Sequence, residues 1–64
     1  MKLIPYHEAA KLLHVPVGTL YAWVHENRVP HVRLGARTVR FDVAALEEWV
    51  RARARRGEEA DDVR

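Results

Sequence analysis

The N-terminal part of the chain alternates apolar and polar residues with the spacing of two short helices. The first helix is predicted over residues 5–13, because four apolar residues at positions i, i+3, i+4 and i+7 share one face: Tyr6, Ala9, Ala10 and Leu13. The second is predicted from Val17 to about Glu26, with a core-facing side made of four residues: Val17, Leu20, Trp23 and Val24. Asn27 and Pro30 end it, because Asn tolerates a left-handed backbone and Pro prevents the helix from resuming.

Only about three residues, His14 to Pro16, connect the two predicted helices. Pro16 should open the second helix, and it disfavours helical backbone at Val15, which we expect to be extended and to fill the gap between the helices. Two short helices joined so closely, at a steep angle, leave one face of the second helix free. This is the layout of a helix-turn-helix, whose second helix can lie in the major groove of DNA.

The hydrophobic period changes from 3.6 to 2 over residues 31–41, which predicts a β-hairpin with a three-residue connection at residues 35–37. Gly35 in that connection can take a positive φ. We expect four apolar residues of the hairpin to face inward: Val32, Leu34, Val39 and Phe41. Arg33 and Arg40 should then share the outward face, with Arg37 at the tip, and the three together form a local positive field.

A final helix is predicted to start with Asp42 as its cap and to run to about Arg55, with Gly57 ending it. Its apolar side is formed by Leu46, Trp49 and Val50. The expected fold is therefore mainly α with a small β-hairpin: a winged helix-turn-helix made of a helix-turn-helix, a two-stranded wing and a C-terminal helix. The domain should span residues 1–56, followed by a disordered acidic tail at residues 57–64.

Length, charge and composition limit the classes of function that the chain can have. The chain has 64 residues, enough for one domain with a modest core and no deep catalytic cleft. It has no cysteine, which excludes disulfides and thiolate metal sites. Residues 1–57 hold ten Lys and Arg against five Asp and Glu, whereas residues 58–64 hold one Arg against four acids. A basic domain favours polyanions, although charge alone does not distinguish a binding surface from a merely solvated one.

Seven segments in this order resemble the pattern of the small MerR-like excisionase and regulator domains. They are Glu8-Ala9-Ala10, Leu12-Leu13-His14-Val15-Pro16, Thr19-Leu20-Tyr21, Asn27-Arg28-Val29-Pro30, Val32-Arg33-Leu34-Gly35, Val39-Arg40-Phe41-Asp42 and Leu46-Glu47-Glu48-Trp49. The chain departs from the pattern at three positions: His14 replaces a glycine of the turn, Pro16 replaces a capping serine, and Asn27 replaces the glycine after the second helix. The resemblance implies binding to double-stranded DNA, with the second helix in the major groove and the wing at the minor groove or the phosphates.

The candidate DNA contacts come from the second helix, the residue beyond it and the wing. They are Gly18, Thr19, Tyr21, Ala22, His25, Arg28, Arg33, Arg37 and Arg40. The face of the helix lacks a long Arg, Lys, Asn or Gln for reading base edges, so we expect DNA shape to contribute to specificity. Other interpretations remain open. Tyr21 can belong partly to the core, the Thr19 hydroxyl can satisfy local backbone, and Trp23 and Trp49 are better explained as core anchors than as base-stacking platforms.

Other chemistry finds little support in the sequence. The four histidines form no HxxxH pair, and no nucleophile–base pair or glycine-rich phosphate loop is present, so we expect no metal, no cofactor and no catalysis. No apolar run is long enough for a signal peptide or a membrane helix, which favours a cytoplasmic, nucleoid-associated protein.

The resemblance leaves two roles open: a recombination directionality factor that assists an integrase, or a small transcriptional regulator. Because no long C-terminal coiled coil follows the domain, we expect a free monomer that assembles cooperatively, head to tail, on DNA. The alternative from another class is a protein-interaction adaptor that uses the Val17 side and the acidic tail.

Overall fold

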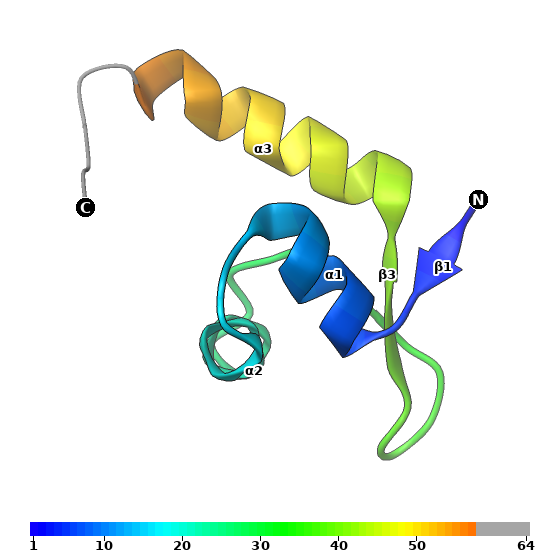
Figure 1. Cartoon of the computed structure of the whole chain (residues 1–64). Helices are drawn as coiled ribbons and strands as arrows, with labels where there is room; N and C mark the ends of the chain where they lie inside the picture. The colour runs from blue at the N-terminus through cyan, green and yellow to red at the C-terminus, as the bar shows by residue number, and fades with distance from the viewer. Residues whose placement is uncertain (58–64) are drawn as a thin grey trace.

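The computed structural model describes residues 1–57, with side chains through residue 54. Its elements are β1 (Leu3–Ile4), α1 (Tyr6–Leu13), α2 (Val17–His25), β2 (Val32–Arg33), β3 (Val39–Asp42) and α3 (Val43–Gly57). The three short strands form an antiparallel sheet in the order β1-β3-β2 (Figure 1). This confirms the predicted winged helix-turn-helix and adds β1 as a third strand beside the two-stranded wing. The predicted acidic tail lies, from residue 58 on, outside the described residues.

A left-handed residue ends α1 and creates the tight turn to α2. His14 has φ 57° and ψ 44°, and its backbone N–H points back to the carbonyls of Ala10 and Lys11. The N–H of Val15 also donates to the Ala10 carbonyl, at 3.0 Å, and its half-buried side chain packs against the core, as predicted. Pro16 immediately precedes α2, and its carbonyl accepts the first hydrogen bonds of that helix. The turn therefore forms with a histidine where the resembled domains carry glycine.

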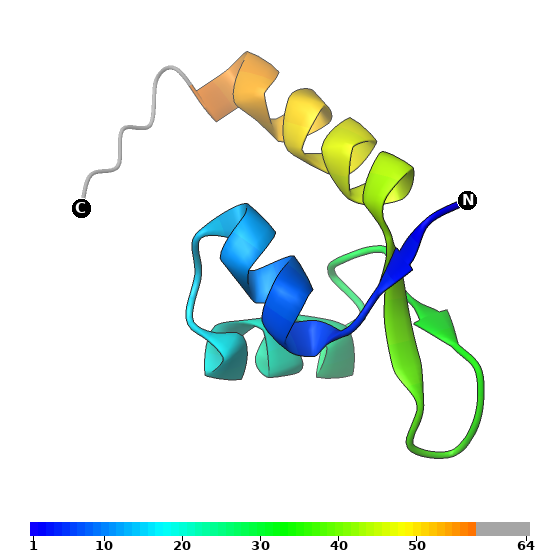
Figure 2. The same cartoon turned by 45° about the vertical axis from the view of Figure 1, so that its right-hand side comes forward.

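The core lies where α1, α2 and α3 meet the inner face of the sheet. In both views α1 lies between α2 and α3 (Figures 1 and 2). Two buried alanines on α1 provide short side chains that let neighbouring backbones approach closely. The buried residues are Ile4, Ala9, Ala10, Leu20, Val24, Val29, Val39, Phe41 and Leu46. Val17 was predicted on this side of α2, but it is 42% exposed in the first turn of the helix, so that part of the prediction was wrong.

The faces of the hairpin differ from the prediction. Val32 pairs with Arg40, and Arg33 pairs with Val39. Because partners across a ladder share a face and successive residues alternate, Arg33 lies on the inner face with Val39, whereas Arg40 lies on the outer face with Val32. The expected shared face of Arg33 and Arg40 was therefore wrong.

The hairpin connection explains this error. The Leu34 N–H donates to the Thr38 carbonyl at 2.7 Å, which matches the expected three-residue connection. This pairing places Leu34 across from Thr38, so Leu34 shares a face with Thr38. Val39, the next residue, lies on the other face, and Leu34 and Val39 therefore cannot both face inward. Leu34 is 58% exposed, and its predicted inward position was wrong. Gly35 does not take a positive φ either, so the turn does not depend on the freedom of glycine.

The predicted cap of α3 is replaced by a strand contact. Asp42 is the last residue of β3, and its Oδ1 atom is buried with no hydrogen-bond partner among the described residues. The Val43 N–H at the start of α3 instead donates to the Lys2 carbonyl at 3.0 Å. The extension of β1, which the sequence did not predict, thus provides an acceptor at this helix end.

Candidate nucleic-acid interface

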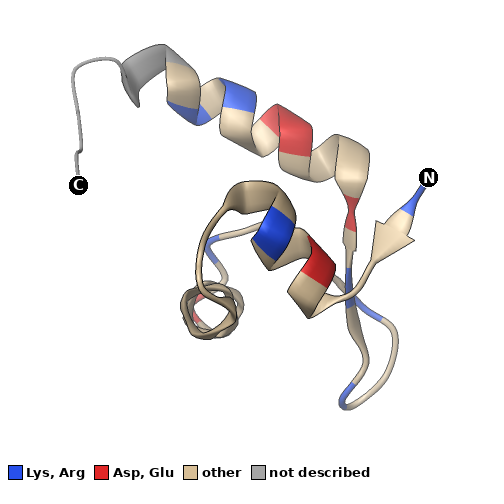
Figure 3. Cartoon of the chain, viewed as in Figure 1, with Lys and Arg blue, Asp and Glu red and all other residues tan. Residues whose placement is uncertain are grey.

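One side of α2 is open to solvent and carries no formal charge. Gly18, Tyr21, Ala22 and His25 are exposed on it, while Leu20 and Val24 are buried on the opposite side. A Cβ built on Gly18 would meet nothing within 4 Å, so a ligand can approach the backbone there. Figure 3 shows α2 without a Lys or Arg along its length. We call these four residues the α2 face.

The aromatic ring of Tyr21 connects the α2 face to the core. Tyr21 is 53% exposed, and its ring stacks on that of Tyr6 with centroids 4.1 Å apart. Tyr6 in turn meets Phe41 edge to face at 5.2 Å. The question of whether Tyr21 belongs to the core is thus answered: it is exposed, but it rests on a residue that is packed against the core.

Tyr6 supports the candidate site, yet the sequence placed it only in the apolar stripe of the first helix. No sequence signal distinguished this role from ordinary core packing. Burial raises the pKa of the Tyr6 hydroxyl above its ordinary value of 10.0, and the neighbouring Tyr21 raises it further. The positive charge of Arg33, a residue on the inner face of the wing, lowers this pKa and partly offsets the other two effects.

Thr19 lies at the edge of the α2 face. Its side chain is half-buried, and its hydroxyl makes no hydrogen bond within the part of the chain that the structure describes. The alternative in which this hydroxyl satisfies local backbone therefore finds no support. The hydroxyl remains available to a ligand at the rim of the face.

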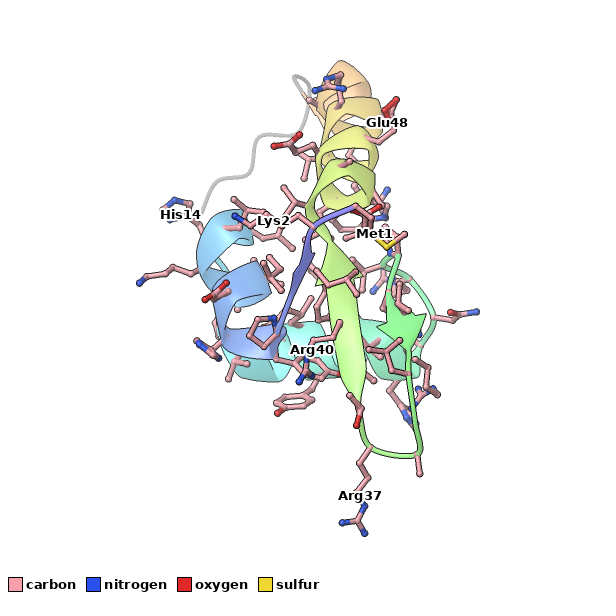
Figure 4. The ribbon with its side chains drawn as sticks, turned by 90° about the vertical axis from the view of Figure 1, so that its right-hand side faces the viewer. Met1, Lys2, His14, Arg37, Arg40 and Glu48 are labelled. Atoms are coloured by element: carbon pink, nitrogen blue, oxygen red, sulfur yellow. The ribbon has the colours of Figure 1, made fainter. Side chains whose placement is uncertain are left out.

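The wing, residues 31–41, presents its arginines in three different directions. Arg37 is exposed at the tip and points away from the body of the molecule (Figure 4). Arg40 is half-buried, and its Nη1 atom donates to the Val39 carbonyl at 2.9 Å. The tip of the wing and α2 lie at the same end of the molecule (Figures 1 and 2). The structure thus brings Arg37 to the end that carries the α2 face, but it does not gather the three arginines on one surface.

Arg28 is held just beyond α2 by backbone contacts. Asn27 takes the left-handed conformation predicted for it, with φ 59°, and the Arg28 N–H donates to the Trp23 carbonyl at 2.8 Å. The Arg28 carbonyl accepts a hydrogen bond from the Trp49 indole N–H at 3.0 Å. Its guanidinium, which is more than half exposed, pairs with Glu26 at 3.3 Å. The cation predicted to contact phosphate is therefore accessible and already binds one carboxylate.

Trp23 and Trp49 act as anchors, as predicted. Both are half-buried and packed against the core, with ring centroids 5.7 Å apart. Within residues 1–54, no three His, Cys, Asp or Glu side chains lie close enough together to hold a metal ion. No helix among the described residues is long and apolar enough to cross a membrane.

Comparison with known proteins agrees with this geometry. A family model described as "Helix-turn-helix domain" matches residues 7–54, more than two thirds of the chain. No curated protein and no solved structure matches the chain. The matched range runs from the first turn of α1 into the C-terminal half of α3 and includes the turn at His14, the α2 face and the whole wing. The chain belongs to the helix-turn-helix domain family, a family of excisionase-like small DNA-binding domains.

Proposed function

We propose that the chain binds double-stranded DNA in a sequence-specific manner, with α2 in the major groove and the wing at the minor groove or the phosphates. The observation that carries this proposal is the placement of an exposed, uncharged helix face and the Arg37 wing tip at one end of a basic domain. An uncharged face can approach base edges closely, while cations outside it neutralise the backbone.

The proposed contacts divide by chemistry. The hydroxyls of Thr19 and Tyr21 donate to phosphates, and Gly18 and Ala22 allow close approach to base edges, with Ala22 suited to a thymine methyl. His25 reaches a base or a phosphate. The phosphate contacts from outside the helix come from four arginines: Arg28, Arg33, Arg37 and Arg40.

The size of the domain bears on how it would assemble on DNA and on its role. A domain of this size covers a short site, so tight binding calls for several copies. We propose a cytoplasmic, nucleoid-associated protein that is monomeric when free and assembles head to tail on repeated sites. It would act as a transcriptional regulator or as a recombination directionality factor beside an integrase. A stable two-fold dimer at micromolar concentration in sedimentation velocity would contradict the assembly part of this proposal.

One observation favours a second candidate function, an adaptor for protein partners. Leu12 and Val50 are 47% and 42% exposed, and they line a groove between α1 and α3 that also includes Leu13 and Leu46. Val17 adds another exposed apolar side chain at the start of α2. Apolar groups of this kind on a small domain are typical of partner surfaces.

Salt titration separates the two functions. Duplexes selected by the wild-type chain from a random pool provide the ligand, and fluorescence anisotropy of the labelled duplex gives the affinity. DNA binding should weaken steeply as salt rises, because each neutralised phosphate releases counterions. A pool from which no duplex is selected, or binding that does not change with salt, would favour the adaptor.

A further inference from the structure

Two tryptophans and two arginines form a pocket beside the C-terminal end of α2. Trp23 comes from α2, Arg28 from the stretch that follows it, and Trp49 and Arg53 from α3. The guanidinium carbon of Arg53 lies 4.4 Å from the centroid of the Trp49 ring, and the indole N–H of Trp49 holds the Arg28 backbone. We call this group the Trp–Arg pocket.

The chemistry of the pocket fits an oxyanion. Arg28 already binds the Glu26 carboxylate at 3.3 Å, in an ion pair more than half exposed on both sides. Exposed ion pairs of this kind contribute little, so another anion can replace the carboxylate at small cost. Among the described side chains, Arg53 contacts an aromatic ring rather than a carboxylate. Stacking on a ring leaves the edge of a guanidinium free to donate two parallel hydrogen bonds.

The position of the pocket fits the DNA backbone. Arg28 follows the end of α2 at His25 by three residues, so the pocket mouth lies next to the end of the helix that would occupy the groove. Both phosphate strands rise on either side of a helix in the major groove. Lys and Arg on the stretch after α2 and on α3 lie well away from the tip of the wing (Figure 3). The pocket therefore offers a phosphate contact separate from that of Arg37.

We propose that the Trp–Arg pocket binds a backbone phosphate of the DNA duplex, with Arg28 and Arg53 as the donors and the two tryptophans as the rigid floor. This inference rests on the proposed DNA-binding function and adds Arg53, on α3, to the residues that contact DNA. The Glu26 carboxylate holds Arg28 in the free protein, and the phosphate replaces it in the complex.

Arg53→Ala and Arg51→Ala are the matched variants that test this proposal. Both residues are exposed on α3, but Arg51 pairs with Glu48 at 3.7 Å and faces a different pocket. For Arg53→Ala, the slope of log affinity against log salt should fall by about one, because one phosphate contact is lost. Arg51→Ala should retain the wild-type slope. Arg53→Lys, which keeps the charge, should retain most of it, and thermal melting by circular dichroism shows that each variant is folded.

Tryptophan emission provides a second readout, since both tryptophans of the chain line the pocket. When the wild-type chain is titrated with duplex, the emission should change in parallel with the anisotropy of the labelled DNA. The change should be much smaller for Arg53→Ala. If the duplex binds while emission stays constant, and Arg53→Ala keeps the slope of Arg51→Ala, the pocket does not contact DNA. If the wild-type chain binds no duplex by anisotropy, the proposed function itself fails, and this inference fails with it.

Discussion

The rings of Tyr6 and Tyr21 stack with centroids 4.1 Å apart and planes inclined by 28°. Tyr6 is at the start of α1, and Tyr21 lies in the middle of the α2 face. Because Tyr6 also contacts Phe41 of β3 edge to face, this one residue connects both helices of the helix-turn-helix to the wing. An exposed aromatic side chain on the proposed binding surface is thus held in place before any ligand arrives, which reduces the entropy lost on binding.

Replacing Tyr6 should weaken both folding and binding. Each of its two aromatic contacts contributes about 0.5–1.5 kcal/mol, so Tyr6→Leu should lower the free energy of unfolding by about 1–3 kcal/mol. Loss of the support under Tyr21 should also reduce the affinity for duplex by roughly fivefold, about 1 kcal/mol. Tyr6→Phe keeps both rings and serves as the control. Urea denaturation and anisotropy measure the two effects; a Leu variant as stable as the Phe variant would show that the stack contributes nothing.

The raised pKa of Tyr6 predicts a loss of stability in alkali. In the unfolded chain this hydroxyl ionises around its ordinary pKa of 10.0, whereas in the folded protein burial keeps it protonated to higher pH. Above pH 10 the folded state therefore binds more protons than the unfolded state, and stability falls as pH rises. Well below pH 10 the hydroxyl is protonated in both states, so it does not make the stability depend on pH. The melting temperature of the wild-type chain should drop more than that of Tyr6→Phe between neutral pH and about pH 11; parallel curves would contradict the prediction.

The left-handed conformation of His14 predicts a stabilising substitution. A non-glycine residue in this region costs about 1–2 kcal/mol, and glycine adds about 0.5–1 kcal/mol of chain entropy to the unfolded state. His14→Gly should therefore raise the free energy of unfolding by about 0.5–1 kcal/mol. His14→Val, with a β-branched side chain at φ 57°, should lower it. Chemical denaturation of the three proteins ranks them, and a glycine variant less stable than the wild type would mean that the imidazole itself stabilises the turn.

Replacing Leu34 of the wing tests which face of the hairpin it occupies, and Leu20 of α2 provides the buried comparison. Leu20 is fully buried, and Leu34 is 58% exposed, although both were predicted to face the core. Leu20→Ala should cost about 2–5 kcal/mol, which will leave this small domain largely unfolded, whereas Leu34→Ala should change stability by less than about 0.5 kcal/mol. Far-UV circular dichroism at increasing temperature distinguishes them. Comparable losses for the two variants would place Leu34 in the core and contradict the observed register.

The helices could be predicted from sequence because local signals set their limits. Periodicity identified the apolar sides of α1 and α2, and the left-handed tolerance of Asn27 was correctly placed at the end of α2. The domain family was also evident from ordered segments, each weak alone. Part of the candidate site could also be predicted from the sequence. The helical spacing predicted an exposed face on α2, and its four residues are exposed: Gly18, Tyr21, Ala22 and His25.

The rest depends on pairing between distant segments. The faces of the wing were taken from alternation within each strand, whereas the three-residue connection pairs Leu34 with Thr38 and so sets the register, and Arg33 and Arg40 were wrongly placed on one face. The strand β1 has two residues, too few for a pattern, and its neighbour Lys2 provides the acceptor at the start of α3 that Asp42 was expected to provide. The Tyr6–Tyr21 stack and the Trp–Arg pocket arise from contacts across elements, which no spacing in the sequence encodes.

The salt dependence of duplex binding by the wild-type chain and by Arg37→Ala tests whether the domain binds DNA through its wing. Arg37 is exposed at the tip of the wing and points away from the body, so its removal should leave the fold intact. Log affinity should fall steeply and linearly with log salt for the wild type, and the slope should be smaller by about one for Arg37→Ala. Binding that ignores salt, or identical slopes for the two proteins, would contradict a wing that grips DNA.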